Sequence, residues 1–118
     1  MIKKAAMWFG IITLAAGILG FIPGITTDGM LLGIFKVNMW HNIVHIATGI
    51  IALLCMSNSG HAKRFFQIFG VVYALVAILG MFDNSGMLLG LLAYNNADMW
   101  LHIVFALLFL YFGFGAKE

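Results

Sequence analysis

Four long apolar segments alternate with shorter polar ones along the chain. They occupy residues 5–22, 39–56, 65–82 and 97–115. None of them shows the strict alternation of polar and apolar positions that is typical of a barrel strand, so each is predicted to be a helix. A bilayer core is about 30 Å thick and requires about 20 apolar residues per helix. The pattern therefore predicts an all-α membrane protein with four transmembrane helices.

Composition strengthens this prediction. The chain has 118 residues, of which 64% are hydrophobic and 8% are charged. So few charges cannot form the polar surface of a soluble domain, which excludes a soluble globular protein, a disordered chain and a basic nucleic-acid-binding domain. The length favours a single domain over residues 1–118. The lipid bilayer is the expected partner, and no nucleic acid is expected.

The basic residues indicate the orientation of the chain. The two outer loops, residues 23–38 and 83–96, hold one lysine, Lys36, together with Asp28 and Asp83. The other basic residues lie near the termini and in the loop between the second and third spans: Lys3, Lys4, Lys63, Arg64 and Lys117. Positive charge marks the cytoplasmic side of a membrane protein. We therefore expect a multi-pass protein of the plasma membrane with both termini in the cytoplasm.

The two halves of the chain repeat each other. Residues 9–12 resemble residues 69–72, and the five residues Gly-Met-Leu-Leu-Gly occur unchanged at 29–33 and 86–90. The repeats cover residues 5–57 and 65–115. Because each repeat contains two spans, both cross the membrane in the same direction, and a pseudo-two-fold axis along the membrane normal is expected. Equivalent residues should then lie at equal depth.

The outer loop of each repeat contains the Gly-Met-Leu-Leu-Gly segment, which is apolar but too short to span a bilayer. We expect a short helix or turn that lies in the membrane interface. The alternative is a re-entrant segment that enters the bundle, where protein or water must satisfy its backbone.

Polar residues gather where the second and fourth spans begin. The second span carries His41 and His45, and the fourth carries Asp98 and His102. Both are i,i+4 pairs on one helix face. At an offset of 57, His41 is equivalent to Asp98 and His45 to His102. If these helices approach the axis, three imidazoles and a carboxylate converge near the outer surface.

Three interpretations of this cluster remain open. In the first, which we favour, the four side chains organise the bundle through hydrogen bonds or bind a small ligand. In the second, His41, His45, Asp98 and His102 bind zinc or copper. In the third, His45 and His102 are the axial ligands of a haem with a redox or sensory role.

Other functions receive less support. A transporter or proton relay ranks third, because no acidic residue lies deeper in the spans to continue a proton path. The chain has no nucleophile triad, P-loop or dinucleotide fingerprint. We therefore expect a protein that is not an enzyme. Small residues on the helix faces leave a homodimer as an option.

Several motifs resemble a known family. Residues 21–24, 28–35 and 41–45, together with 69–73 and 98–102, are similar to the bacterial membrane family called domain of unknown function 4383. The resemblance covers nearly the whole chain. It implies a small four-helix protein of the bacterial inner membrane. It implies no activity, because the function of the family is not established.

Overall fold

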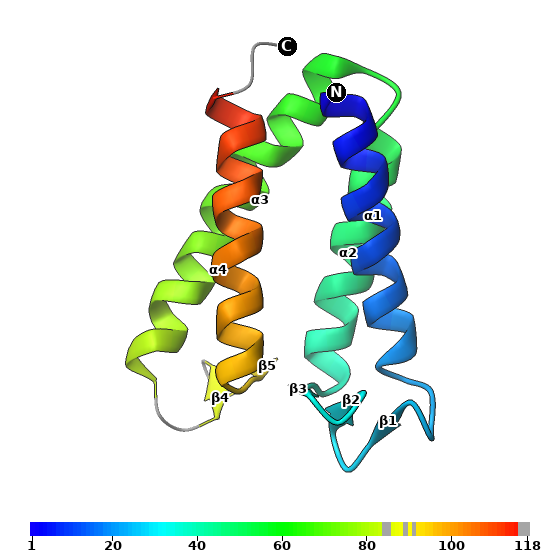
Figure 1. Ribbon diagram of the computed structural model, residues 1–118, viewed down its shortest axis with the longest axis vertical. Coiled ribbons are helices and arrows are strands. Elements are labelled where there is room, and N and C mark those ends of the chain that lie inside the picture. The colour runs from blue at the N-terminus through cyan, green and yellow to red at the C-terminus, as the bar shows by residue number, and fades with distance from the viewer. Residues whose placement is uncertain (84–85, 89, 91, 116–118) are drawn as a thin grey trace.

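The computed structural model describes residues 1–83, 86–88, 90 and 92–115, and these residues form an all-helical bundle with short strands at one end (Figure 1). Leu89 of the second repeated segment and Lys117 lie outside the described residues. The helices, in chain order, are α1 (Ile2–Leu19), α2 (Met39–Cys55), α3 (Ser59–Phe82) and α4 (Asn96–Leu110), which continues as the π-helix η1 (Tyr111–Gly115). Each helix overlaps one predicted apolar segment, although α1 begins and ends three residues earlier and α3 begins six residues earlier than predicted.

Three of the described helices are long and apolar enough to cross a membrane: α1, α3 and the continuous helix Asn96–Gly115. The helix α2 has 17 residues and is a shorter apolar helix. That length is at the lower end of the range of about 17–25 residues for spanning helices. Large apolar side chains, including Trp8, Leu75 and Leu107, are exposed on the outside of the bundle. These features indicate a membrane protein.

The helices form two antiparallel hairpins, α1 with α2 and α3 with α4, which lie beside each other (Figure 1). The start of α1 and the end of η1 lie at the same end of the bundle. In the first hairpin the backbones approach closely through glycines. A Cβ atom on Gly17 would lie 2.7 Å from the backbone oxygen of Asn42, and one on Gly49 would lie 2.6 Å from the backbone nitrogen of Leu14.

A cluster of aromatic rings joins the two hairpins. Phe9 of α1 packs edge-on against Phe109 at 5.0 Å and against Phe105 at 5.5 Å between ring centroids. Phe66 is fully buried beside them, at 6.1 Å from Phe9. Edge-to-face packing is a favourable geometry for aromatic rings. The apolar core therefore holds the hairpins together from the middle of the bundle towards the termini.

The described residues of the outer loops form short strands joined by turns, so the expected short interfacial helices are not confirmed. The first loop holds β1 (Thr26–Thr27), β2 (Met30–Leu31) and β3 (Phe35–Lys36), and the second holds β4 (Met87–Leu88) and β5 (Leu92–Ala93). The physical reason is the backbone at the glycines. Gly29, Gly33, Gly86 and Gly90 have φ between 71° and 80°. This left-handed conformation suits glycine and interrupts a right-handed helix.

The two loops share one backbone pattern at an offset of 57 residues. Met30 pairs with Lys36, and Met87 pairs with Ala93, in the same antiparallel register. The backbone N–H of Val37 donates to Gly29 at 2.8 Å, and that of Tyr94 donates to Gly86 at 3.1 Å. Each loop then leads directly into a helix, α2 or α4, at its asparagine N-cap.

Candidate histidine site

The N-caps of α2 and α4 place the polar side chains of the site. Asn38 accepts a hydrogen bond from the backbone N–H of His41 at 3.0 Å, and Asn95 accepts one from Asp98 at 3.0 Å. Asparagine is favoured at this position because its side chain satisfies a free N–H group of the first turn. His41 and Asp98 therefore occupy the same turn of their helices, and a second histidine follows one turn later in each.

Three imidazoles converge at this end of the bundle. One ring nitrogen from each of His41, His45 and His102 lies within 4.8 Å of the other two. The ring centroids are 4.6 Å apart for His41 and His45, 5.7 Å for His41 and His102, and 5.8 Å for His45 and His102. All three side chains are buried. The helices α2 and α4 thus bring His102 beside His45 and His41, which lie 57 and 61 positions earlier in the sequence.

Backbone carbonyls orient two of these rings. His41 Nδ1 lies 2.6 Å from the carbonyl oxygen of Ala93, and His102 Nδ1 lies 2.8 Å from that of Asp98. A carbonyl oxygen only accepts, so Nδ1 carries the proton and donates in both rings. In the neutral ring the lone pair is then on Nε2. Among the described residues, the buried Nε2 atoms of His41 and His45 have no hydrogen-bond partner.

Asp98 has a different position from its equivalent, His41. Its Oδ2 accepts from the backbone N–H of Asn95 at 3.0 Å, which completes a capping box at the start of α4. The carboxylate also faces the backbone and the ammonium group of Lys36. Asp98 is therefore not one of the three residues whose ligand atoms converge. The structure brings together three of the four residues singled out by sequence.

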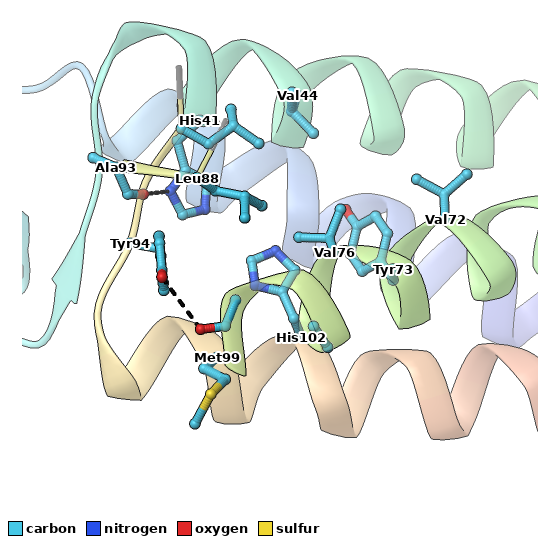
Figure 2. Close-up of a pocket in the computed structure, with 13 residues that line it drawn as sticks. His41, Val44, Val72, Tyr73, Val76, Leu88, Ala93, Tyr94, Met99 and His102 are labelled. Atoms are coloured by element: carbon cyan, nitrogen blue, oxygen red, sulfur yellow. Dashed lines mark hydrogen bonds between the residues drawn. The ribbon is translucent and has the colours of Figure 1, made fainter. Parts of the chain in front are cut away.

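A cavity of about 50 Å³ adjoins His41 and His102. Figure 2 shows the two rings pointing from α2 and α4 into the same space, beside Leu88 and Tyr73. A single water needs about 10–15 Å³ of such volume. The cavity therefore has room for a very small molecule next to the imidazoles.

Tyr94 closes one side of this cavity. Its hydroxyl donates to the carbonyl oxygen of Gly80 at 3.2 Å, and it also contacts the carbonyl oxygen of Asp83. Desolvation raises the pKa of the Tyr94 phenol, and the Asp83 carboxylate raises it further. The phenol therefore stays protonated and acts as a donor that ties the second outer loop to the end of α3.

Tyr73 and Ala93 also belong to the site, although sequence reasoning missed them. The Tyr73 ring lies 5.3 Å from that of His102, and its hydroxyl donates to Thr48 at 3.2 Å. The repeat contained a signal for Tyr73, because Thr13 is its equivalent at an offset of 60 and both are polar residues in an apolar span. No signal identifies Ala93, which contributes only its backbone oxygen.

Fold and site define a helical protein with membrane-length helices and a buried cluster of three histidines. The chain belongs to the family described as Domain of unknown function (DUF4383), whose family model matches residues 3–115. This confirms the family suggested by the sequence motifs. Neither a curated protein nor a solved structure gives a significant match to the chain.

Proposed function

We propose that the chain is a small integral membrane protein that binds a transition-metal ion and has no catalytic activity. His41, His45 and His102 would bind the metal near the outer surface of the bundle. The observation that carries this proposal is the convergence of three imidazoles in which two buried Nε2 atoms lack any partner among the described residues. A buried polar atom without a partner is costly, and a metal ion would satisfy these atoms.

The proposed topology has four spans arranged as two tandem hairpins. It is supported by the equal registers of the two outer loops and by the asparagine N-caps of α2 and α4, all at an offset of 57. The proposed orientation places both termini in the cytoplasm of a bacterial cell. Its support is that Lys3 lies near the start of α1, and Lys63 and Arg64 near the start of α3, and that both helices begin at the end of the bundle opposite the strands (Figure 1).

The surroundings of the rings fit metal binding. A histidine that binds a metal usually donates its other ring N–H to a carbonyl or carboxylate, which fixes the ring and directs its lone pair. His41 and His102 make such bonds to Ala93 and Asp98. Three imidazole nitrogens are a known ligand set for Zn²⁺ and also suit copper. A fourth position would face the cavity beside His41 and His102.

The geometry supports a metal ion better than a haem. A haem bound by His45 and His102 would have to lie between their rings, which are 5.8 Å apart between centroids. The ring of His41 lies 4.6 Å from that of His45 and 5.7 Å from that of His102. The cavity of about 50 Å³ that His102 lines is too small for a porphyrin, and the cavity of about 340 Å³ that His45 lines does not include His102.

A second candidate function is structural, and one contact favours it. The hydrogen bond from His41 to Ala93 joins the start of α2 to the second outer loop, across 52 positions of sequence. In this case the histidines would hold the two hairpins together without a metal. Such a protein would be folded in the absence of any metal ion.

The test uses protein purified in mild detergent without an affinity tag of histidines or a chelator. Elemental analysis and titration with Zn²⁺ and Cu⁺ would measure the metal content and the affinity. We expect about one metal per chain, which is lost in His45→Ala and His102→Ala and retained in His61→Ala. His61 is a matched control because it is the remaining histidine of the chain and lies outside the cluster.

Two results would favour the structural role instead. One is a wild-type protein that neither contains nor retains metal yet stays folded. The other is an equal loss of metal in His45→Ala and His61→Ala, which would mean that the metal binds elsewhere. An intense Soret band in the purified protein would show bound haem and would overturn the proposal of a simple metal ion.

A further inference from the structure

A second and larger cavity lies between the two hairpins. Its volume is about 340 Å³. This is within the range of about 300–1,000 Å³ that is common for small-molecule sites. Its walls come from α1, α2, α4 and the first outer loop, and most of the lining side chains are apolar. The ring of His45 lines this cavity, whereas His41 and His102 line the smaller one.

The rim of this cavity includes exposed apolar side chains. Ile12 of α1 is 49% exposed, and Leu32 of the first outer loop is 61% exposed. Because α1 is long and apolar enough to cross a membrane, the side of the bundle that carries Ile12 faces lipid. A molecule dissolved in the bilayer would therefore have direct access to the cavity.

Three residues of this otherwise apolar cavity carry hydrogen-bonding side chains. His45 and Asp98 line it and are 5% and 1% exposed. The Nε2 atom of His45 has no partner among the described residues. The hydroxyl of Thr13, which also lines the cavity, donates to the carbonyl oxygen of Phe9 in its own helix at 2.8 Å. His45 and Asp98 are therefore the hydrogen-bond acceptors available to a bound molecule, and the carboxyl group of Asp98 disfavours an anion.

Two aromatic side chains also line the cavity. Phe35 belongs to β3 and Phe105 to α4. Flat aromatic side chains favour a flat aromatic ligand, because offset-stacked or edge-to-face contacts then add to the burial of apolar area. A purely aliphatic chain would be stabilised only by the burial of apolar area and would make no ring–ring contacts.

We propose that this cavity binds an uncharged, lipid-soluble aromatic molecule whose ring carries hydroxyl groups, the chemistry of an isoprenoid quinol. The ring would lie between Phe35 and Phe105, a hydroxyl would donate to His45 or Asp98, and the isoprenoid chain would leave past Ile12 into the bilayer. The cavity shares His45 with the proposed metal site, so the test uses metal-free protein, in which failure to bind the quinol leaves the metal proposal untouched.

The experiment measures binding of a short-chain quinol, ubiquinol with one isoprene unit, by anaerobic calorimetry of the full chain in lipid nanodiscs. Ala16→Phe would fill the cavity from α1, and we expect it to weaken binding at least about tenfold. Ile11→Phe is the matched control, since Ile11 lies on the same helix, is exposed and does not line the cavity. We expect it to bind as the wild type does.

Two further measurements test the polar side chains. Asp98→Asn keeps the shape of the side chain and leaves the three imidazoles in place, and we expect it to weaken quinol binding severalfold without changing metal affinity. Dodecanoate, an anion of similar apolar size, should bind at least tenfold more weakly than the quinol. The proposal is overturned if the quinol does not bind, if Ala16→Phe and Ile11→Phe bind it equally, or if dodecanoate binds better.

Discussion

The two outer loops share the register of one strand pair and an asparagine N-cap, but the helices that follow carry different side chains at two equivalent positions. His41 and Asp98 occupy the third residue of α2 and α4, each after an asparagine N-cap. His41 reaches the carbonyl oxygen of Ala93 in the opposite loop, and Asp98 faces Lys36, the equivalent of Ala93. Each side chain therefore reaches across to the other hairpin, but only the histidine belongs to the cluster.

This difference shows how two helices with the same N-cap can contribute unequally to one site. A site with the same residues in both halves would hold either four histidines or two histidines and two carboxylates. In this chain α2 supplies two imidazoles, and α4 supplies one imidazole and a carboxyl group that caps its own helix. The carboxyl group is thereby left to line the larger cavity with His45.

Exchanging the two unlike residues should have the largest effect. In His41→Asp the cluster loses one of its three ligands, and a carboxylate replaces the N–H that donates to Ala93. Changes to residues around a metal site already cost about 10–100-fold in affinity. We therefore expect His41→Asp to lower the metal affinity on the order of 100-fold. Competition with a chelating dye would measure this affinity.

The double variant His41→Asp with Asp98→His tests whether the halves are interchangeable. It restores three imidazoles, now with two from α4 and one from α2. We expect metal affinity within about tenfold of the wild type. Asp98→Asn is the control, because it removes the carboxylate without adding a ligand. A double variant that binds no better than His41→Asp would show that the halves are not equivalent.

A second difference between the hairpins concerns where their helices approach most closely. In the first hairpin the close approach is at Gly17 and Gly49. In the second it is at Gly113, whose added Cβ would lie 2.7 Å from the backbone nitrogen of Gln67. Gly17 of α1 is equivalent to Ala77 of α3, and Gly49 of α2 to Ala106 of α4. In Gly17→Ala the new methyl group would lie 2.7 Å from the backbone oxygen of Asn42 and 2.8 Å from the backbone nitrogen of Ile46. Backbone atoms cannot yield as a flexible side chain does, so we expect a loss of about 1–3 kcal/mol in the free energy of unfolding.

The same substitution in the second hairpin is the control. A Cβ on Gly80 would lie 3.5 Å from the Tyr94 ring, which is an ordinary contact. Alanine is about 1 kcal/mol better than glycine inside a helix, so Gly80→Ala should be neutral or stabilising. Unfolding in mixed micelles with increasing dodecyl sulfate measures both variants. Equal losses of unfolding free energy in the two variants would contradict the tight contact at Gly17.

Sequence predicted much of the frame of this protein. The apolar segments gave the four helices, because a helix is the arrangement in which a long apolar segment satisfies its own backbone in lipid. The offset of 57 identified His45 and His102 as equivalent residues at the start of two spans, and they lie in one cluster. The sequence motifs also identified the family.

Other features depend on contacts that a sequence pattern does not contain. Asp98 turns to the N–H of Asn95 and to Lys36, and the competition between these partners and the imidazoles is decided by tertiary structure. Ala93 acts through its carbonyl oxygen, which every residue possesses. The loop at 29–33 is apolar, so its pattern favoured a helix or turn, whereas the positive φ of Gly29 and Gly33 produces short strands.

The smallest effect concerns the bonds that tie each outer loop to the preceding helix. In the second loop the Tyr94 hydroxyl donates to Gly80, and in the first the Thr26 hydroxyl donates to Leu19 at 2.9 Å. Removal of either donor, in Tyr94→Phe or Thr26→Val, should cost about 1 kcal/mol of unfolding free energy. The comparison becomes sharper when metal affinity is measured as well. Tyr94 is next in sequence to Ala93, whose carbonyl oxygen orients His41. Thr26 is not next in sequence to Ala93 or to any of the three histidines.

Tyr94→Phe should therefore weaken metal binding about threefold, while Thr26→Val should leave it unchanged. The reason is that a looser second loop lets the carbonyl oxygen of Ala93 move, and His41 then loses part of its fixed orientation. Both variants are expected to lose the same unfolding free energy. Isothermal titration of both with Zn²⁺ in the same detergent therefore separates this effect from general destabilisation. If both variants lost affinity equally, the orientation of His41 would depend on the whole outer end of the bundle and not on the second loop alone.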